Sequence, residues 1–172
     1  MNSLPDPVMQ LIRAALQPRV QPAPSRADDP VCRVVLAAAK ADMKAGGTDH
    51  LMRLSAGAGC AASGLTFWLS KERETDLEML ISQLRSVLPD GVPERDAVKM
   101  IETMLTGPPG VQQTAAFLYR MFTDDEERFY DLIVGLGRYC AECVGTLSTF
   151  GISSEEDTLD DLNDMLQAFY TG

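Results

Sequence analysis

The sequence predicts an all-α fold, a single compact, bundle-like domain of seven or eight helices. Two observations support this prediction. Apolar residues recur at spacings of three and four along nearly the whole chain after Pro30, a pattern typical of helices with one buried face. The chain contains no long alternating run of β-branched residues bounded by turns, so strands are not expected. Its 172 residues, 45% of them hydrophobic, suit one domain with a core of ordinary size.

The first predicted element is a short helix, Pro7–Leu16. One face of this helix carries four apolar residues, Val8, Leu11, Ile12 and Ala15. The stretch that follows, Gln17–Pro30, contains several prolines and cannot continue a helix. We therefore divide the chain into residues 1–29, a helical segment with a proline-rich linker, and residues 30–172, an all-α domain. The helical segment either docks on this domain or binds a partner.

Five helices are expected in the middle of the chain, and three of them end just before a glycine or proline. Their expected ranges are Val31–Ala45, Thr48–Lys71, Glu74–Leu88, Pro93–Thr106 and Val111–Phe122. The second range contains Gly57, Gly59 and Gly64. A glycine lowers helix stability by up to about 1 kcal/mol relative to alanine, but it lets a neighbouring helix approach closely. We expect tight packing at these glycines, or a break near Gly57–Gly59.

Two more helices are expected at the C-terminal end, each beginning at a possible capping box. In a capping box a hydroxyl and a glutamate side chain accept hydrogen bonds from free amides at the helix start. The first box would join Thr123 to Glu126, and the second would join Ser153 to Glu156. Acidic residues in a first turn also interact favourably with the helix dipole.

The negative charge is concentrated in the C-terminal half. The net charge of the chain is −10, of which residues 1–86 contribute +1 and residues 87–172 contribute −11. A surface of this kind suits either a basic partner or simple solvation. Direct binding to nucleic acid is not expected, because phosphates require a patch of lysine and arginine that this half lacks.

Cys140 and Cys143 form the chain's Cys-x-x-Cys motif, with three possible interpretations. Both fall on the apolar stripe of the helix expected from Asp124, where cysteine behaves as a small hydrophobic residue. They could instead form a redox pair, although a position some four turns inside a helix would deprive them of the acidifying dipole. A metal site would need further ligands, and Cys32 and Cys60 stand alone in the sequence.

Other signals of catalysis or targeting are weak. The single histidine, His50, is best explained as an exposed or capping polar residue, and no nucleotide-binding or nucleophile-elbow motif occurs. We expect no cofactor, and the enzyme interpretation is disfavoured. The N-terminus lacks the features of a signal peptide, and the most apolar run, Leu54–Leu69, is too short to span a membrane. We therefore expect a cytoplasmic protein with reduced cysteines and no membrane association.

These observations favour a non-enzymatic protein that binds another protein with a basic surface, as an inhibitor, immunity protein, chaperone or adaptor would. The expected contact surface is an acidic face of the last two helices, made of Asp124, Asp125, Glu127, Asp157, Asp160, Asp161 and Asp164. Two alternatives remain open. One is a thiol redox or metal-binding protein using Cys140 and Cys143, and the other is a protein that mimics the charge of nucleic acid.

Overall fold

The fold is all-α, as predicted, with eight helices and no strand in the residues that the structure describes. The computed structural model describes residues 6–18, 28–89, 91–105 and 108–171. The helices are α1 (Pro7–Leu16), α2 (Pro30–Ala45), α3 (Asp49–Glu72), α4 (Leu77–Ser86), α5 (Pro93–Leu105), α6 (Pro108–Asp124), α7 (Glu126–Thr149) and α8 (Glu155–Thr171). Much of the predicted linker, residues 19–27, lies outside the described residues.

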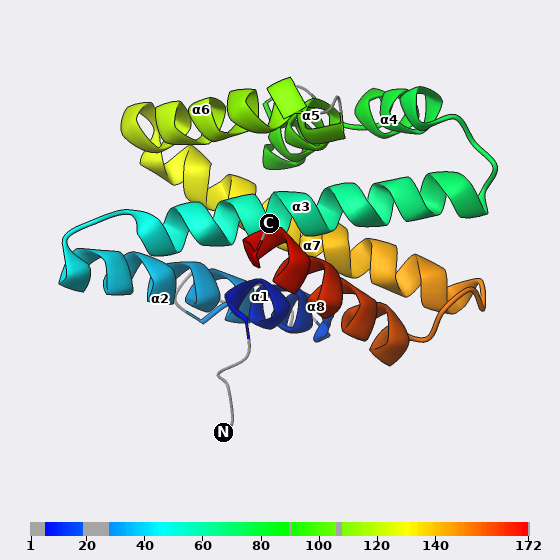
Figure 1. Cartoon of the computed structure of the whole chain (residues 1–172), viewed down its shortest axis with the longest axis horizontal. Helices are drawn as coiled ribbons and strands as arrows, with labels where there is room; N and C mark the ends of the chain where they lie inside the picture. Colours follow the sequence, from blue (N-terminus) through cyan, green and yellow to red (C-terminus); the bar gives the residue numbers. More distant parts are fainter. Residues whose placement is uncertain (1–5, 19–27, 90, 106–107, 172) are drawn as a thin grey trace.

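The two longest helices, α3 and α7, pack side by side and form the centre of the bundle. Figure 1 shows α1, α2 and α8 on one side of this pair, and α4, α5 and α6 on the other. Each flanking helix contacts α3, α7 or both. The core therefore lies along the central pair, where large side chains such as Phe129, Leu132 and Leu136 of α7 are fully buried.

Of the two alternatives for the N-terminal segment, the structure shows docking. Helix α1 packs against α7, α2 and α3, and its Val8, Leu11 and Ile12 are fully buried. The helix starts at Asp6, whose carboxylate accepts a hydrogen bond from the Val8 amide at 2.8 Å. Helix α1 is therefore part of the hydrophobic core that it shares with residues 30–172.

The glycines of α3 permit close packing and leave the helix unbroken. A Cβ atom at Gly57 would lie 2.4 Å from the Tyr170 hydroxyl of α8, and one at Gly64 would lie 2.6 Å from the sulfur of Met165. At Gly59 it would lie 2.3 Å from the terminal methyl of Met100, which belongs to α5. The expectation of tight packing is confirmed, and a break near Gly57–Gly59 does not occur.

Both predicted capping boxes are wrong by one or two residues. Helix α6 continues to Asp124, and the Thr123 hydroxyl donates back to carbonyls within α6, so Asp125 caps α7 by accepting from the Arg128 amide at 3.2 Å. At α8 the cap is Ser154, whose hydroxyl accepts from the Asp157 amide at 3.2 Å. Aspartate is a better N-cap than threonine, which favours Asp125 over Thr123, whereas Ser153 and Ser154 are equivalent in type and backbone geometry decides between them.

Candidate functional site

The four aspartates predicted on the last helix do share one exposed face of α8. Residues Asp157, Asp160, Asp161 and Asp164 all lie at the surface, and their helical spacing keeps them within about a third of the helix circumference. The opposite side of α8 carries buried residues, including Leu159, Leu162 and Leu166, which hold the helix against α3 and α7. Within the described ranges, none of the four carboxylates forms an ion pair.

The three acidic residues predicted on the preceding helix do not join this face. Asp124, Asp125 and Glu127 are exposed, but they lie at the α6–α7 junction. Helix α7 has 24 residues and so separates this junction from the α7–α8 loop by about 36 Å. Figure 1 shows the two regions at opposite ends of the bundle. The predicted surface therefore consists of two groups, and one member, Asp125, is engaged as the N-cap of α7.

Two apolar side chains are exposed in the loop that leads into α8. Phe150 is 67% exposed and Ile152 is 37% exposed. The loop is held by hydrogen bonds from the Ile152 and Ser153 amides to the Leu147 carbonyl, and Gly151 takes a left-handed conformation with φ of 68°. Phe150 and Ile152 precede the acidic first turn of α8 by only a few residues in the sequence. Interface centres are commonly built from such aromatic anchors with a polar rim.

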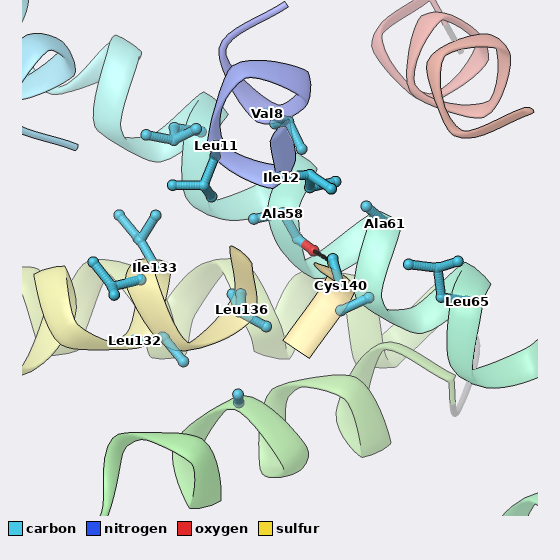
Figure 2. Close-up of a cluster of buried hydrophobic side chains, with 14 of the residues drawn as sticks. Val8, Leu11, Ile12, Ala58, Ala61, Leu65, Leu132, Ile133, Leu136 and Cys140 are labelled. Atoms are coloured by element: carbon cyan, nitrogen blue, oxygen red, sulfur yellow. Dashed lines mark hydrogen bonds between the residues drawn. The ribbon is translucent and has the colours of Figure 1, made fainter. Parts of the chain in front are cut away.

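Cys140 and Cys143 lie in the core, as their place on the apolar stripe predicted. Cys140 is fully buried, and Cys143 is 4% exposed. In Figure 2 the Cys140 side chain points from α7 towards Ala58 of α3, whose carbonyl oxygen lies 4.0 Å from the sulfur. Leu65 and Leu136 surround the same region. The two thiols are thus packed between α3 and α7 and are not presented at a surface.

Burial also suppresses the reactivity of these thiols. It raises the pKa of Cys140 well above its ordinary value and raises that of Cys143 to about 12, although a hydrogen bond with Tyr139 partly opposes the second shift. A protonated thiol is a poor nucleophile and a poor metal ligand. Residues three apart on a helix have Cβ atoms about 5–6 Å apart, whereas a disulfide needs about 3.5–4.5 Å. Closing a disulfide between them would therefore distort α7.

A metal site is equally unsupported by the geometry. No group of three or more histidine, cysteine, aspartate or glutamate residues is placed to hold a metal ion within the part of the chain that the structure describes. Cys60 approaches Cys140 closely enough to influence its pKa, but burial raises the pKa of Cys60 as well. Cys140 and Cys143 therefore pack as small apolar residues.

Sequence reasoning missed the role of Asp42, a nearly buried carboxylate at the end of α2. Its Oδ1 accepts from the His50 amide at 2.8 Å and lies 2.9 Å from His50 Nδ1, while Oδ2 accepts from the Leu51 amide at 2.9 Å. Asp42 thus caps α3 from the preceding helix, and Thr48 at the nominal cap makes no side-chain hydrogen bond. In the sequence, the only sign of this role is that Asp42 stands eight residues before His50, across the Gly46-Gly47 turn.

Three comparisons with known proteins found no match for the chain. No family model matches it, and neither a curated protein nor a solved structure shows significant similarity. Among the described residues, the helices are all too short or too polar to cross a membrane. The function must therefore be argued from the site alone.

Proposed function

We propose that this protein binds another protein with a basic surface through the acidic face of α8. The observation that carries the proposal is the set of four exposed carboxylates on one face of that helix, Asp157, Asp160, Asp161 and Asp164. Structural carboxylates in this protein cap helices or pair with arginine, as Asp125 and Asp96 do. The four on α8 do neither within the described residues. Asp157 lies in the first turn, where it interacts favourably with the helix dipole, so the charges of Asp160, Asp161 and Asp164 have no visible structural task.

Electrostatic complementarity would govern how such a partner is recognised. A row of like charges on one face attracts an oppositely charged surface over about 10 Å at moderate salt and accelerates encounter. Charged residues at an exposed rim mainly affect the association rate, while buried apolar anchors supply most of the affinity. The adjacent Phe150 and Ile152 are suited to the second role because both are exposed. The proposal therefore predicts steering by α8 and anchoring by the α7–α8 loop.

The two alternative functions receive less support from the geometry. Thiol or metal chemistry would require access to Cys140 and Cys143, and both are buried. A mimic of nucleic-acid charge would need carboxylates continued along a surface at phosphate-like spacing. The seven acidic residues predicted for the contact surface divide instead into two groups at opposite ends of α7. We therefore place the binding surface on α8 and assign no reaction to the protein.

The experiment that tests this proposal is a capture of partners by tagged protein from an extract of the cells that produce it. The α8 variant would carry Asp157→Asn, Asp160→Asn, Asp161→Asn and Asp164→Asn. The junction variant would carry Asp124→Asn and Glu127→Gln at the α6–α7 junction, together with Glu78→Gln on α4 and Glu94→Gln on α5. These four changes alter the net charge equally and spare the cap at Asp125. We expect a stoichiometric partner to bind the wild type and the junction variant, to be lost by the α8 variant, and to dissociate at higher salt.

Two other outcomes would contradict this placement. A partner that binds the α8 variant as well as the wild type would exclude the α8 face as the contact surface. Capture of a protein that binds DNA or RNA, lost equally in both variants, would favour the charge mimic because only total charge would then matter.

A further inference from the structure

A cavity of about 190 Å³ lies between α1, α2, α3 and α8, away from the acidic face. Its apolar wall is formed by Val34, Ala38, Ala41 and Leu54. Four polar side chains, Gln10, His50, Arg53 and Tyr170, also line it. A cavity of roughly 150 Å³ accommodates one benzene ring, so this space suits a single ring or a short branched chain with a polar group attached.

Among the residues described as lining this cavity, Arg53 is the one arginine or lysine. Its guanidinium carbon lies 4.1 Å from the centre of the Tyr170 ring, a cation–π contact that holds the planar group in place. Within the described part of the chain, Arg53 forms no ion pair with a carboxylate. A guanidinium has five N–H donors, and the contact with the Tyr170 hydroxyl engages only part of them. Arg53 is exposed, so its other donors are open to solvent and to a ligand.

Two carboxylates that contact residues lining the cavity are already committed to helix starts. Asp6 caps α1 through the Val8 amide, and its Oδ1 is 3.5 Å from the Tyr170 hydroxyl. Asp42 accepts hydrogen bonds from two backbone amides and holds His50 through Nδ1. Neither carboxylate lines the cavity. In a protein of net charge −10, this leaves a local site where an apolar wall adjoins a cation.

From this combination we propose that the cavity binds a small monocarboxylic acid. The carboxylate pairs with the Arg53 guanidinium, and the apolar part lies against Val34, Ala41 and Leu54. Arginine is suited to this task because its fork of N–H donors matches both oxygens of a carboxylate. His50, one turn before Arg53 on α3, forms the neighbouring wall and is kept in place by Asp42. This site is independent of the binding function proposed for α8.

The test uses the full chain and three acids of increasing length, benzoate, phenylacetate and hexanoate, with their uncharged amides as matched probes. Binding is followed by ¹H–¹⁵N chemical shifts and by calorimetry. We expect at least one acid to bind with a Kd in the range of about 1 mM or tighter, with shifts centred on α2 and α3. The corresponding amide should bind at least about tenfold more weakly, because it lacks the charge-assisted hydrogen bonds.

Three variants locate the site. Arg53→Gln should weaken binding of the acid about tenfold or more while leaving the weak binding of the amide unchanged. Ala41→Leu should remove binding of both by filling the cavity, and Arg120→Gln, an exposed arginine on α6, should change neither. Thermal unfolding of each variant confirms that it is folded. If Arg53→Gln proves unstable, Arg53→Lys takes its place; this variant keeps the charge and should retain partial binding of the acid.

The proposal is overturned by any of three results. These are no shift with any acid at about 10 mM, equal affinity for acids and amides, or an affinity that Arg53→Gln and Ala41→Leu leave unchanged. None of these outcomes bears on the acidic face of α8, because helix α8 contributes only Tyr170 to the cavity and none of its aspartates.

Discussion

At the scale of single residues, the structure depends on polar side chains that satisfy helix ends. Asp42 shows this most directly, because it is 4% exposed yet accepts hydrogen bonds from two amides at the start of α3. Burial raises the pKa of Asp42, but hydrogen bonds from Leu51 and His50 outweigh it, so the pKa is lowered overall. The folded state therefore favours the ionised carboxylate.

The first prediction concerns the loss of this cap. Asp42→Ala leaves two amides without a partner and should lower the free energy of unfolding by about 1–3 kcal/mol at neutral pH. Asp49→Ala, which removes an exposed carboxylate from the same helix start, is the control and should have a small effect. Urea denaturation of both variants measures the difference.

The pH dependence of this loss follows from the lowered pKa. A carboxyl group whose folded pKa is below the unfolded value of about 3.9 contributes fully above that pH. The contribution disappears as the pH falls through the folded pKa. The gap between wild type and Asp42→Ala should therefore narrow in acid, and a gap that stays constant down to the lowest pH at which the protein folds would contradict this account.

The second prediction at this scale concerns the thiols. In the folded protein, Cys140 and Cys143 should react with iodoacetamide far more slowly than half-buried Cys32, because they are buried and protonated. Pulse labelling followed by mass spectrometry of peptides measures each rate, and denaturant should make all four cysteines equally reactive. Rapid labelling of Cys140 and Cys143 without denaturant would instead support the redox alternative.

At the scale of helices, glycines of α3 and α7 determine how closely the flanking helices pack against this central pair. Gly137 of α7 faces α1, and a Cβ atom there would lie 2.7 Å from Cγ of the fully buried Leu11. Gly145, two turns further along the same helix, has nothing within 4 Å of the equivalent position. The two glycines therefore share a helix but have opposite steric surroundings.

Substituting alanine at each position separates packing from helix propensity. Gly145→Ala should stabilise the protein by up to about 1 kcal/mol, because alanine is the better helix former and meets no obstacle. Gly137→Ala should destabilise it by about 1–3 kcal/mol, since the added methyl group forces Leu11 and α1 to shift. Thermal or urea unfolding of the pair provides the measurement. Equal stabilisation by both substitutions would show that α1 does not pack closely on α7.

The helices themselves could be predicted from the sequence, while their arrangement could not. The apolar spacing of Pro7–Leu16 predicts the helix, but its docking depends on contacts with residues more than a hundred positions away, such as Gly137. Glycines in α3 indicate close packing without naming Tyr170, Met100 or Met165 as the partners. The predicted cap of α7 was wrong for a local reason, because Thr123, Asp124 and Asp125 are neighbouring candidates for the same position. The cavity at Arg53 could not be predicted from the sequence, because its lining residues come from four different helices.

At the scale of the whole molecule, the distribution of charge distinguishes one helix from the rest. Sequence reasoning predicted exposed acids in the C-terminal half, and the seven chosen residues are all exposed. It treated two helices as one face, although the helix expected from Asp124 was already long enough to separate its first turn from α8. The α8 group lies on a helix held at the outside of the bundle by Leu159, Leu162 and Leu166. The binding function proposed for that face remains a prediction.

The most direct test of this central claim is the salt dependence of the association rate between the protein and its captured partner. We predict that the rate for wild type falls steeply with increasing salt and that the α8 variant is slower and far less sensitive to salt. The junction variant, with the same net charge as the α8 variant, should follow the wild type. Equal salt dependence in wild type and the α8 variant would contradict the claim that the acidic face of α8 is the recognition surface.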